Sequence, residues 1–218
     1  MYTHRNPIIV QQGTGLESRH TIGAALSFLK HRWSGYTELD GQLGKFNGHP
    51  LVAWKLTQTI TYQLPIDFSK PAFSVQSAIS SGDHDLQDST LNTFNAIYPK
   101  AIYYGFLDNA GSANLYLLHL KTELEALHKL KITVGYYMFW RQSIVDGVYG
   151  PSGLLLLPSH NDQRRVGAMT DIMALFICSS HVSFRAIAAY YKRGPFLKQQ
   201  AGAPHDTKYL GITATIRL

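Results

Sequence analysis

The chain has 218 residues, a formal net charge of +6 and 16% charged residues, fewer than the roughly 25% of an ordinary soluble domain. Lys and Arg are scattered rather than clustered, which argues against a nucleic-acid partner. No apolar run is long enough for a transmembrane helix, and the single cysteine, Cys178, excludes an internal disulfide. Tyr is the most frequent aromatic residue, and it suits the boundary between water and an apolar phase.

In chain order, the sequence predicts an irregular lead-in at residues 1–16, followed by strands. The lead-in contains Asn6-Pro7 and Gly13-Thr14-Gly15, which break regular structure. Beyond it, apolar and polar residues alternate, as they do in strands whose two faces meet different surroundings. About nine strands are predicted, at residues 17–29, 33–43, 51–63, 72–81, 114–123, 130–143, 164–178, 182–191 and 207–218.

The segment from Leu130 to Ser143 shows this alternation most clearly. Its apolar side carries Leu130, Ile132, Val134, Tyr136, Met138 and Trp140. A half-buried strand of a soluble sandwich would show the same pattern. The segment is nevertheless longer than the ~5–6 residues of an ordinary strand, whereas a tilted strand needs about 9–11 residues to cross a bilayer. Because the pattern recurs along the whole chain, we interpret these segments as transmembrane strands.

The connections between the predicted strands alternate in length. Turns near residues 31, 126 and 180 are short, whereas residues 82–114, 144–163 and 192–205 form long, polar connections. In an outer-membrane barrel the long loops lie at one end and the short turns at the other. The sequence therefore predicts an all-β fold, an antiparallel up-and-down transmembrane β-barrel.

Several sequence blocks resemble the alginate-export family of bacterial outer-membrane barrels. They are Glu17-Ser18-Arg19-His20-Thr21-Ile22-Gly23, Ser81-Gly82-Asp83-His84-Asp85, Thr93-Phe94-Asn95 with Tyr98-Pro99-Lys100, Phe139-Trp140-Arg141-Gln142-Ser143 with Asp146-Gly147-Val148-Tyr149, Arg164-Arg165-Val166-Gly167, and Thr215-Ile216-Arg217-Leu218. The resemblance implies a porin or exporter in the outer membrane of a Gram-negative bacterium. It implies passive diffusion of an anionic polysaccharide such as alginate, or of a related anionic solute, with no enzymatic activity and no cofactor. Outer-membrane lipid and the barrel-assembly machinery are the other partners that it implies.

Two features depart from the family pattern. Such chains usually end in an aromatic residue, whereas this one ends in Leu218. Family members are also about twice as long, and the predicted strand count is odd, whereas bacterial single-chain barrels have even counts. We therefore expect residues 1–218 to be a single barrel domain that forms the C-terminal portion of a longer chain.

If the apolar positions face lipid, the charged residues of the opposite parity face the lumen. They are Arg19, Lys55, Arg141, Arg165, Arg185, Arg217, Glu38, Asp40 and Asp171. Arg and Lys attract anions in pores, and the fork of Arg matches a carboxylate. The alternative is that these residues are ordinary solvated or ion-paired groups without selectivity. Arg19 and Arg141 are the best candidates, because they lie within the family blocks.

Other functions remain open on the sequence. The barrel could be a general diffusion porin, a soluble β-barrel that binds a small ligand, or an outer-membrane hydrolase that uses Ser18, His20 and Glu17. The hydrolase is disfavoured because neighbours on a strand face opposite ways and no GxSxG motif occurs. We interpret the acidic segment from Gly82 to Asp88 as a polar turn and not as a cation-binding site, so no metal site is predicted.

Overall fold

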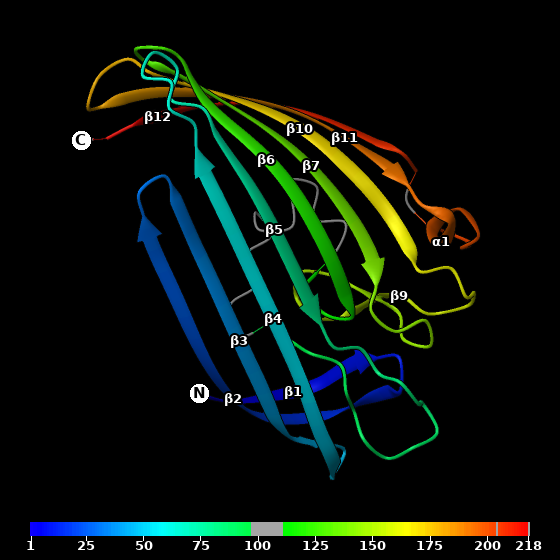
Figure 1. Ribbon diagram of the computed structural model, residues 1–218. Helices are drawn as coiled ribbons and strands as arrows, with labels where there is room; N and C mark the ends of the chain where they lie inside the picture. Colours follow the sequence, from blue (N-terminus) through cyan, green and yellow to red (C-terminus); the bar gives the residue numbers. More distant parts are fainter. Residues whose placement is uncertain (97–110, 204, 218) are drawn as a thin grey trace.

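The computed structural model describes residues 1–96, 111–203 and 205–217, so Tyr98-Pro99-Lys100 and Leu218 lie outside it. Ten strands form one antiparallel sheet in which successive strands pair in sequence order, apart from a small hairpin, which confirms the up-and-down topology (Figure 1). The strands of this sheet are β1 (Tyr2–Val10), β2 (Gly13–Lys30), β3 (Trp33–Phe46), β4 (His49–Gln63), β5 (Ala72–Ser80), β6 (Leu115–Leu127), β7 (Leu130–Arg141), β10 (Arg165–Ile177), β11 (Val182–Arg193) and β12 (Thr207–Ile216).

Two small elements lie outside this sheet. Strands β8 (Val148–Tyr149) and β9 (Leu155–Leu157) form a hairpin between β7 and β10, and α1 (Pro195–Lys198) is a single helical turn after β11. No helix in the part of the chain that the structure describes is long and apolar enough to cross a membrane. Strands β1 and β12 are the edges of the large sheet, which is curved but is not closed by the described residues (Figure 1).

The irregular lead-in predicted for residues 1–16 is wrong, because residues 2–10 form β1. Its register on β2 shifts between Arg5 and Ile8, so Pro7 sits in a bulge. Proline cannot donate to a sheet ladder and is tolerated at bulges and on edge strands, and β1 is an edge strand. Within the described ranges the large sheet therefore has ten strands, an even number, where about nine were predicted.

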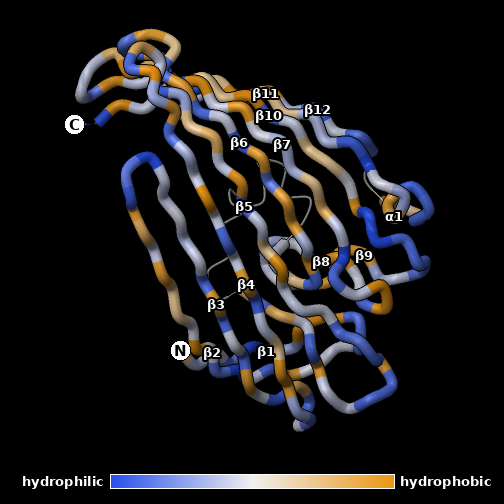
Figure 2. Tube along the Cα trace, in the orientation of Figure 1, coloured by the Kyte–Doolittle hydropathy of each residue, from blue (hydrophilic) through white to orange (hydrophobic). Residues whose placement is uncertain are grey.

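Hydrophobic and hydrophilic residues alternate along many of the strands (Figure 2). Cross-strand partners lie on the same face, and the registers place Ile22, Trp54 and Ile172 on what we call the outer face. Apolar side chains of this face are exposed, with Ile22 77% and Ile212 78% accessible. Exposed apolar surface on this scale indicates contact with something other than water.

The opposite face, which we call the inner face, carries the polar positions and the molecule's only large buried clusters within the described ranges. Both clusters combine inner-face residues of the sheet with residues from its connections. The first contains Leu117, Tyr137, Phe139, Met169, Tyr191, Val148, Phe196 and Leu197, and the second contains Ile8, Phe46, Leu51, Ala53, Leu91, Phe94 and Tyr149. The connections thus fold back against the inner face instead of extending away from the sheet.

The strand directions place the connections 81–114, 142–164 and 194–206 at one end of the sheet, which we call the long-loop end. The short turns at 31–32, 128–129 and 178–181 lie at the other end, as predicted. Asn47-Gly48 is a short turn at the long-loop end. Its φ values of 50° and 84° are those of the tight hairpin turns that Asn-Gly favours.

Candidate functional site

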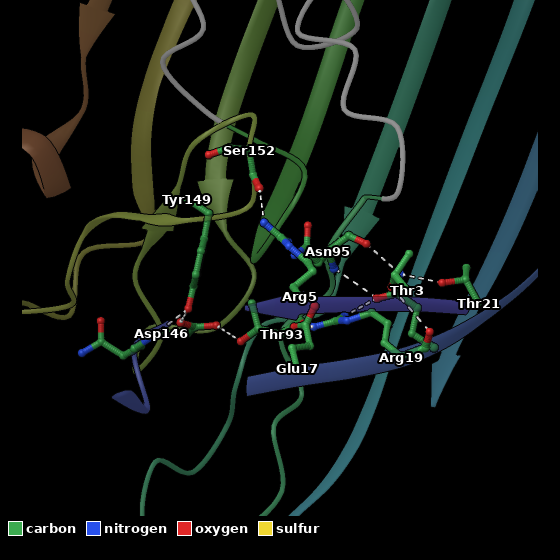
Figure 3. A network of polar contacts seen from close by, with 12 residues as sticks. Thr3, Arg5, Glu17, Arg19, Thr21, Thr93, Asn95, Asp146, Tyr149 and Ser152 are labelled. Atoms are coloured by element: carbon green, nitrogen blue, oxygen red, sulfur yellow. Dashed lines mark hydrogen bonds and ion pairs between the residues drawn. The ribbon is translucent and has the colours of Figure 1, made fainter. Parts of the chain in front are cut away.

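A buried ion pair lies on the inner face of β2, near the long-loop end (Figure 3). Arg19 Nη2 donates to the carboxylate of Glu17, and Arg19 Nη1 donates to the side chain of Gln42 and to the carbonyl of Thr93 at 3.1 Å. Gln42 in turn donates to the carbonyl of Asn95 at 2.7 Å. Glu17 and Arg19 are 0% and 2% exposed. The pair therefore fixes residues 93–95 of the long connection against β2 and β3.

A polar cavity of about 510 Å³ adjoins this ion pair. Arg5 of β1 and Arg19 of the neighbouring strand β2 line it, together with Glu17 and with Asn95 and Ser152 from the connections. Arg5 reaches across the cavity and donates to the carbonyl of Ser152 at 2.9 Å (Figure 3). Arg19 Nε and Glu17 Oε1 are buried without a hydrogen-bond partner among the described residues. The cavity thus offers both positive charge and unused hydrogen-bonding capacity.

Asp146 is the centre of a second buried network that joins the two long connections. Its carboxylate accepts hydrogen bonds from Thr93 Oγ1 at 2.7 Å, Tyr149 Oη at 2.6 Å and the backbone N–H groups of Asp83 at 2.8 Å and Gly147 at 2.7 Å (Figure 3). Four donors satisfy a buried carboxylate well. They hold residues 83–93 against residues 146–149.

Asp83 lies beside this network and is fully buried. Its Oδ2 has no hydrogen-bond partner within the described residues. Burial, and after it the negative charge of Asp146, raise the pKa of Asp83 to about 7. Because an unfolded aspartate has a pKa of roughly 3.9, the folded connection binds a proton more tightly than the unfolded chain does.

This linkage predicts that the connection loosens as the pH rises. The stabilisation from protonated Asp83 is fully present below about pH 4 and is lost as the pH rises through about 7. We expect proteolysis of residues 82–96 to accelerate between pH 6 and 8 in the native chain and to lose that pH dependence in Asp83→Asn. Asp85→Asn changes an exposed acid two residues away and is the control. A pH profile identical in native and Asp83→Asn protein would contradict this assignment.

Arg141, the last residue of β7, organises the connection that follows it. Its guanidinium donates to the backbone carbonyls of residues 144, 146, 161 and 163, at 2.6 to 3.1 Å, and to Ser159 Oγ at 2.6 Å. The same group lies 4.1 Å from the centre of the Phe196 ring of α1. Arg141 is 1% exposed, so all of its donors serve the protein itself.

Four of the predicted lumen residues lie on the inner face and remain partly accessible: Lys55, Glu38, Asp40 and Arg185. Lys55 is the cross-strand partner of Asp40 and lies 5.9 Å from the centre of the Phe94 ring. The cross-strand partners of Arg185 are Leu175 on β10 and Thr213 on β12. These residues share a face with Arg19, but the structure does not gather them into one cluster with it.

Arg165 does not share that face, and its prediction as a lumen residue is wrong. The register of β10 on β7 pairs Gly167 with Phe139 and Arg165 with Trp140, so Val166 is an extra residue in a bulge. A bulge reverses the parity of the residues beyond it. Arg165 therefore lies on the outer face with Trp140.

Two further predicted residues have different surroundings. Asp171 is on the inner face and 4% exposed, where it accepts a hydrogen bond from the Tyr137 hydroxyl, while its Oδ2 has no partner among the described residues. Gly135 makes this packing possible, because a Cβ there would collide with Asp171 and approach Tyr137 to 2.9 Å. Arg217 follows β12 and is exposed at the short-turn end.

The structure also bears on the other sites considered from the sequence. Ser18 and His20 lie on the outer face, where His20 packs on Tyr2 with ring centres 4.8 Å apart, whereas Glu17 lies on the inner face. These residues therefore form no catalytic triad. In the ranges that the structure describes, no group of three or more His, Cys, Asp or Glu residues could hold a metal ion.

Sequence reasoning missed several residues of the site. Arg5 was missed because β1 was expected to be irregular. The roles of Gln42, Asn95, Asp146 and Tyr149 depend on connections that fold inward, and aperiodic segments carry no face pattern from which such contacts could be found. The grouping of Thr93-Phe94-Asn95 and Asp146-Gly147-Val148-Tyr149 within the family blocks was the available signal.

Comparison with known proteins assigns the family. No curated protein sequence is similar enough to this chain to be counted as a relative. A family model described as alginate export matches residues 1–210, which include nine strands of the large sheet in full and the beginning of β12. Since this match covers nearly the whole chain, the protein belongs to the alginate export family, a family of outer-membrane transport proteins.

Proposed function

We propose that the inner face forms part of the wall of a passage through the outer membrane, along which an anionic polysaccharide such as alginate, or a related anionic solute, moves by passive diffusion. The observation that carries this proposal is the contrast between an exposed apolar outer face and an inner face that carries most of the charged residues of the strands. An exposed apolar outer face suits lipid, and a polar inner face suits a water-filled lumen.

The cavity between Arg5 and Arg19 supports a preference for anions. Both arginines line the same space of about 510 Å³, and Arg5 is held only by a backbone carbonyl, with no acidic partner in the described residues. A guanidinium without a carboxylate partner can bind the carboxylate of a passing sugar acid through paired hydrogen bonds. Arg19 is neutralised by Glu17, so it adds positive charge only weakly.

Elsewhere on the inner face, several charges are balanced by ion pairs. Lys121 pairs with Glu123 at 3.0 Å, and Lys131 approaches Glu125 at 3.6 Å. Such pairs bind a passing anion weakly, and weak binding suits transit, because a solute must leave each site as readily as it enters. The same balance favours the second candidate function, a general diffusion porin with little charge preference.

Ion selectivity separates the two candidates. In planar bilayers under a salt gradient, we expect the reversal potential of the native protein to indicate anion preference. Arg5→Gln combined with Arg185→Gln removes two inner-face cations that have no acidic partner in the described residues, and we expect the anion-to-cation permeability ratio to fall by about two- to threefold, since lumen residues tune selectivity.

Arg32→Gln is the matched control, because it removes an exposed cation from a short turn and should leave the ratio unchanged. Weak selectivity that the inner-face substitutions do not alter would favour the general porin. A cation preference in the native protein would contradict the anionic-solute proposal.

A further inference from the structure

The outer face carries a basic cluster at the long-loop end that the passage does not use. It consists of Arg165 on β10, Lys192 on β11 and Lys208 on β12, and all three side chains are exposed. The bulge at Val166 turns Arg165 to this face. The registers pair Lys192 with Ala168 and Lys208 with Tyr190, so the three cations lie on adjoining strands of one surface.

This cluster has no acidic partner in the ranges that the structure describes. The outer faces of β7, β10, β11 and β12, which the structure describes completely, carry no Asp or Glu. Asp206, in the connection before β12, is held by Arg193 at 3.4 Å and by the Tyr190 hydroxyl at 3.2 Å. Three uncompensated cations therefore mark the edge of an apolar face.

A hollow of about 540 Å³ opens on the same face directly below the cluster. Its lining includes the small residues Thr170 and Ala188 between the larger Val134, Ile172 and Tyr190, and Lys208 stands at its rim. Its surface is mainly apolar, so it suits a hydrocarbon chain. Trp140 and Tyr190 flank the site at the level of the cations, as aromatic side chains do at a membrane–water interface.

We propose that this surface binds a lipid with a net negative phosphate headgroup, with the phosphate against Arg165, Lys192 and Lys208 and an acyl chain in the hollow over Thr170 and Ala188. The charge of the cluster selects the headgroup, because guanidinium and ammonium groups bind phosphate by charge-assisted hydrogen bonds. The site lies at the long-loop end, the end that faces the cell exterior in outer-membrane barrels. The proposal rests on contact between the outer face and lipid, which the proposed function also requires.

Quenching of Trp140 by brominated lipid tests the site, because Trp140 is the cross-strand partner of Arg165. The chain has three tryptophans, so Trp33→Phe with Trp54→Phe leaves Trp140 alone. The protein is reconstituted in phosphatidylcholine vesicles that contain a minor fraction of brominated phosphatidylglycerol or of brominated phosphatidylcholine. We expect Trp140 to prefer the anionic lipid by about fivefold or more at low ionic strength. The triple substitution Arg165→Gln, Lys192→Gln and Lys208→Gln should bring that preference close to one.

Two controls keep the outcome decisive. In the first control, Trp54 on the outer face of β4 is the only tryptophan, and both lipids should quench it equally. Quenching of Trp54 by either lipid also shows, independently of the lipid site, that the outer face is in contact with lipid. Lys30→Gln with Arg32→Gln removes cations at the short-turn end and should leave the Trp140 preference intact. Lys208→Gln alone, an exposed change on the edge strand, should lower the preference even if the triple variant folds poorly. Equal quenching of Trp140 by the two lipids, or a preference that survives the substitutions, would overturn the lipid site.

Discussion

Arg141→Ala is expected to release the connection at residues 142–164 while leaving the sheet assembled. The substitution removes the donors that four backbone carbonyls and Ser159 share, and these groups are buried or partly buried. At roughly 1–3 kcal/mol for each buried group left unsatisfied, the connection should lose about 3 kcal/mol or more of local stability. Hydrogen–deuterium exchange of residues 142–164 should therefore accelerate roughly a hundredfold.

Two variants separate the geometry of Arg141 from its charge. Arg141→Lys keeps the charge without the fork, so it should recover only part of the protection. Arg164→Ala removes a neighbouring, exposed arginine whose guanidinium donates to the carbonyls of Arg141 and Gln142, so it should accelerate exchange much less than Arg141→Ala does. If exchange in Arg141→Ala matched the native chain while ion selectivity was lost, Arg141 would act on the solute and not on the connection.

Arg19→Ala is expected to destabilise the folded protein by about 3–5 kcal/mol, because it leaves Glu17 charged, buried and without its partner. Glu17→Ala should cost a similar amount for the converse reason. The double substitution should cost clearly less than the sum of the two, since it removes both charges together. Urea unfolding of the refolded protein in detergent measures all three values.

The matched comparison is Lys121→Ala at the pair with Glu123. That pair is also on the inner face and its atoms are 3.0 Å apart, but its side chains are 32% and 48% exposed. Solvent-accessible pairs contribute roughly 0–1 kcal/mol, so this variant should unfold almost as the native chain does. Additive single effects at Glu17 and Arg19 would show that the two side chains do not act as a pair.

The sequence predicted the two faces of the sheet correctly wherever the strands are regular. The alternation placed Ile22, Trp54 and Ile172 on one face, and the registers agree. It failed at irregular positions. Pro7 concealed β1 because a bulge accommodates it, and the bulge at Val166 moved Arg165 to the opposite face. A single extra residue reverses parity and leaves no mark in the alternation itself.

The candidate site was less predictable than the sheet. Arg19 and Arg141 were singled out, but their partners are in large part backbone carbonyls of distant connections. Every residue has a backbone carbonyl, so the sequence gives no sign of which carbonyl will accept the hydrogen bond. The sequence therefore indicated which side chains matter without indicating what they contact. The structure changes the role of Arg141 from a group that faces the solute to one that holds the connection in place.

Accessibility of neighbouring positions on one strand tests most directly whether lipid covers the outer face and water the inner face. In a Cys178→Ser background, single cysteines at Thr59 and Ile60 on β4, and at Thr133 and Val134 on β7, are treated with a membrane-impermeant maleimide after reconstitution in lipid. Thr59→Cys and Thr133→Cys should react, whereas Ile60→Cys and Val134→Cys, at positions where the native side chains are 51% and 41% exposed, should be protected until detergent or denaturant is added. Equal reaction at both members of each pair, or faster reaction at Ile60→Cys and Val134→Cys, would contradict the account.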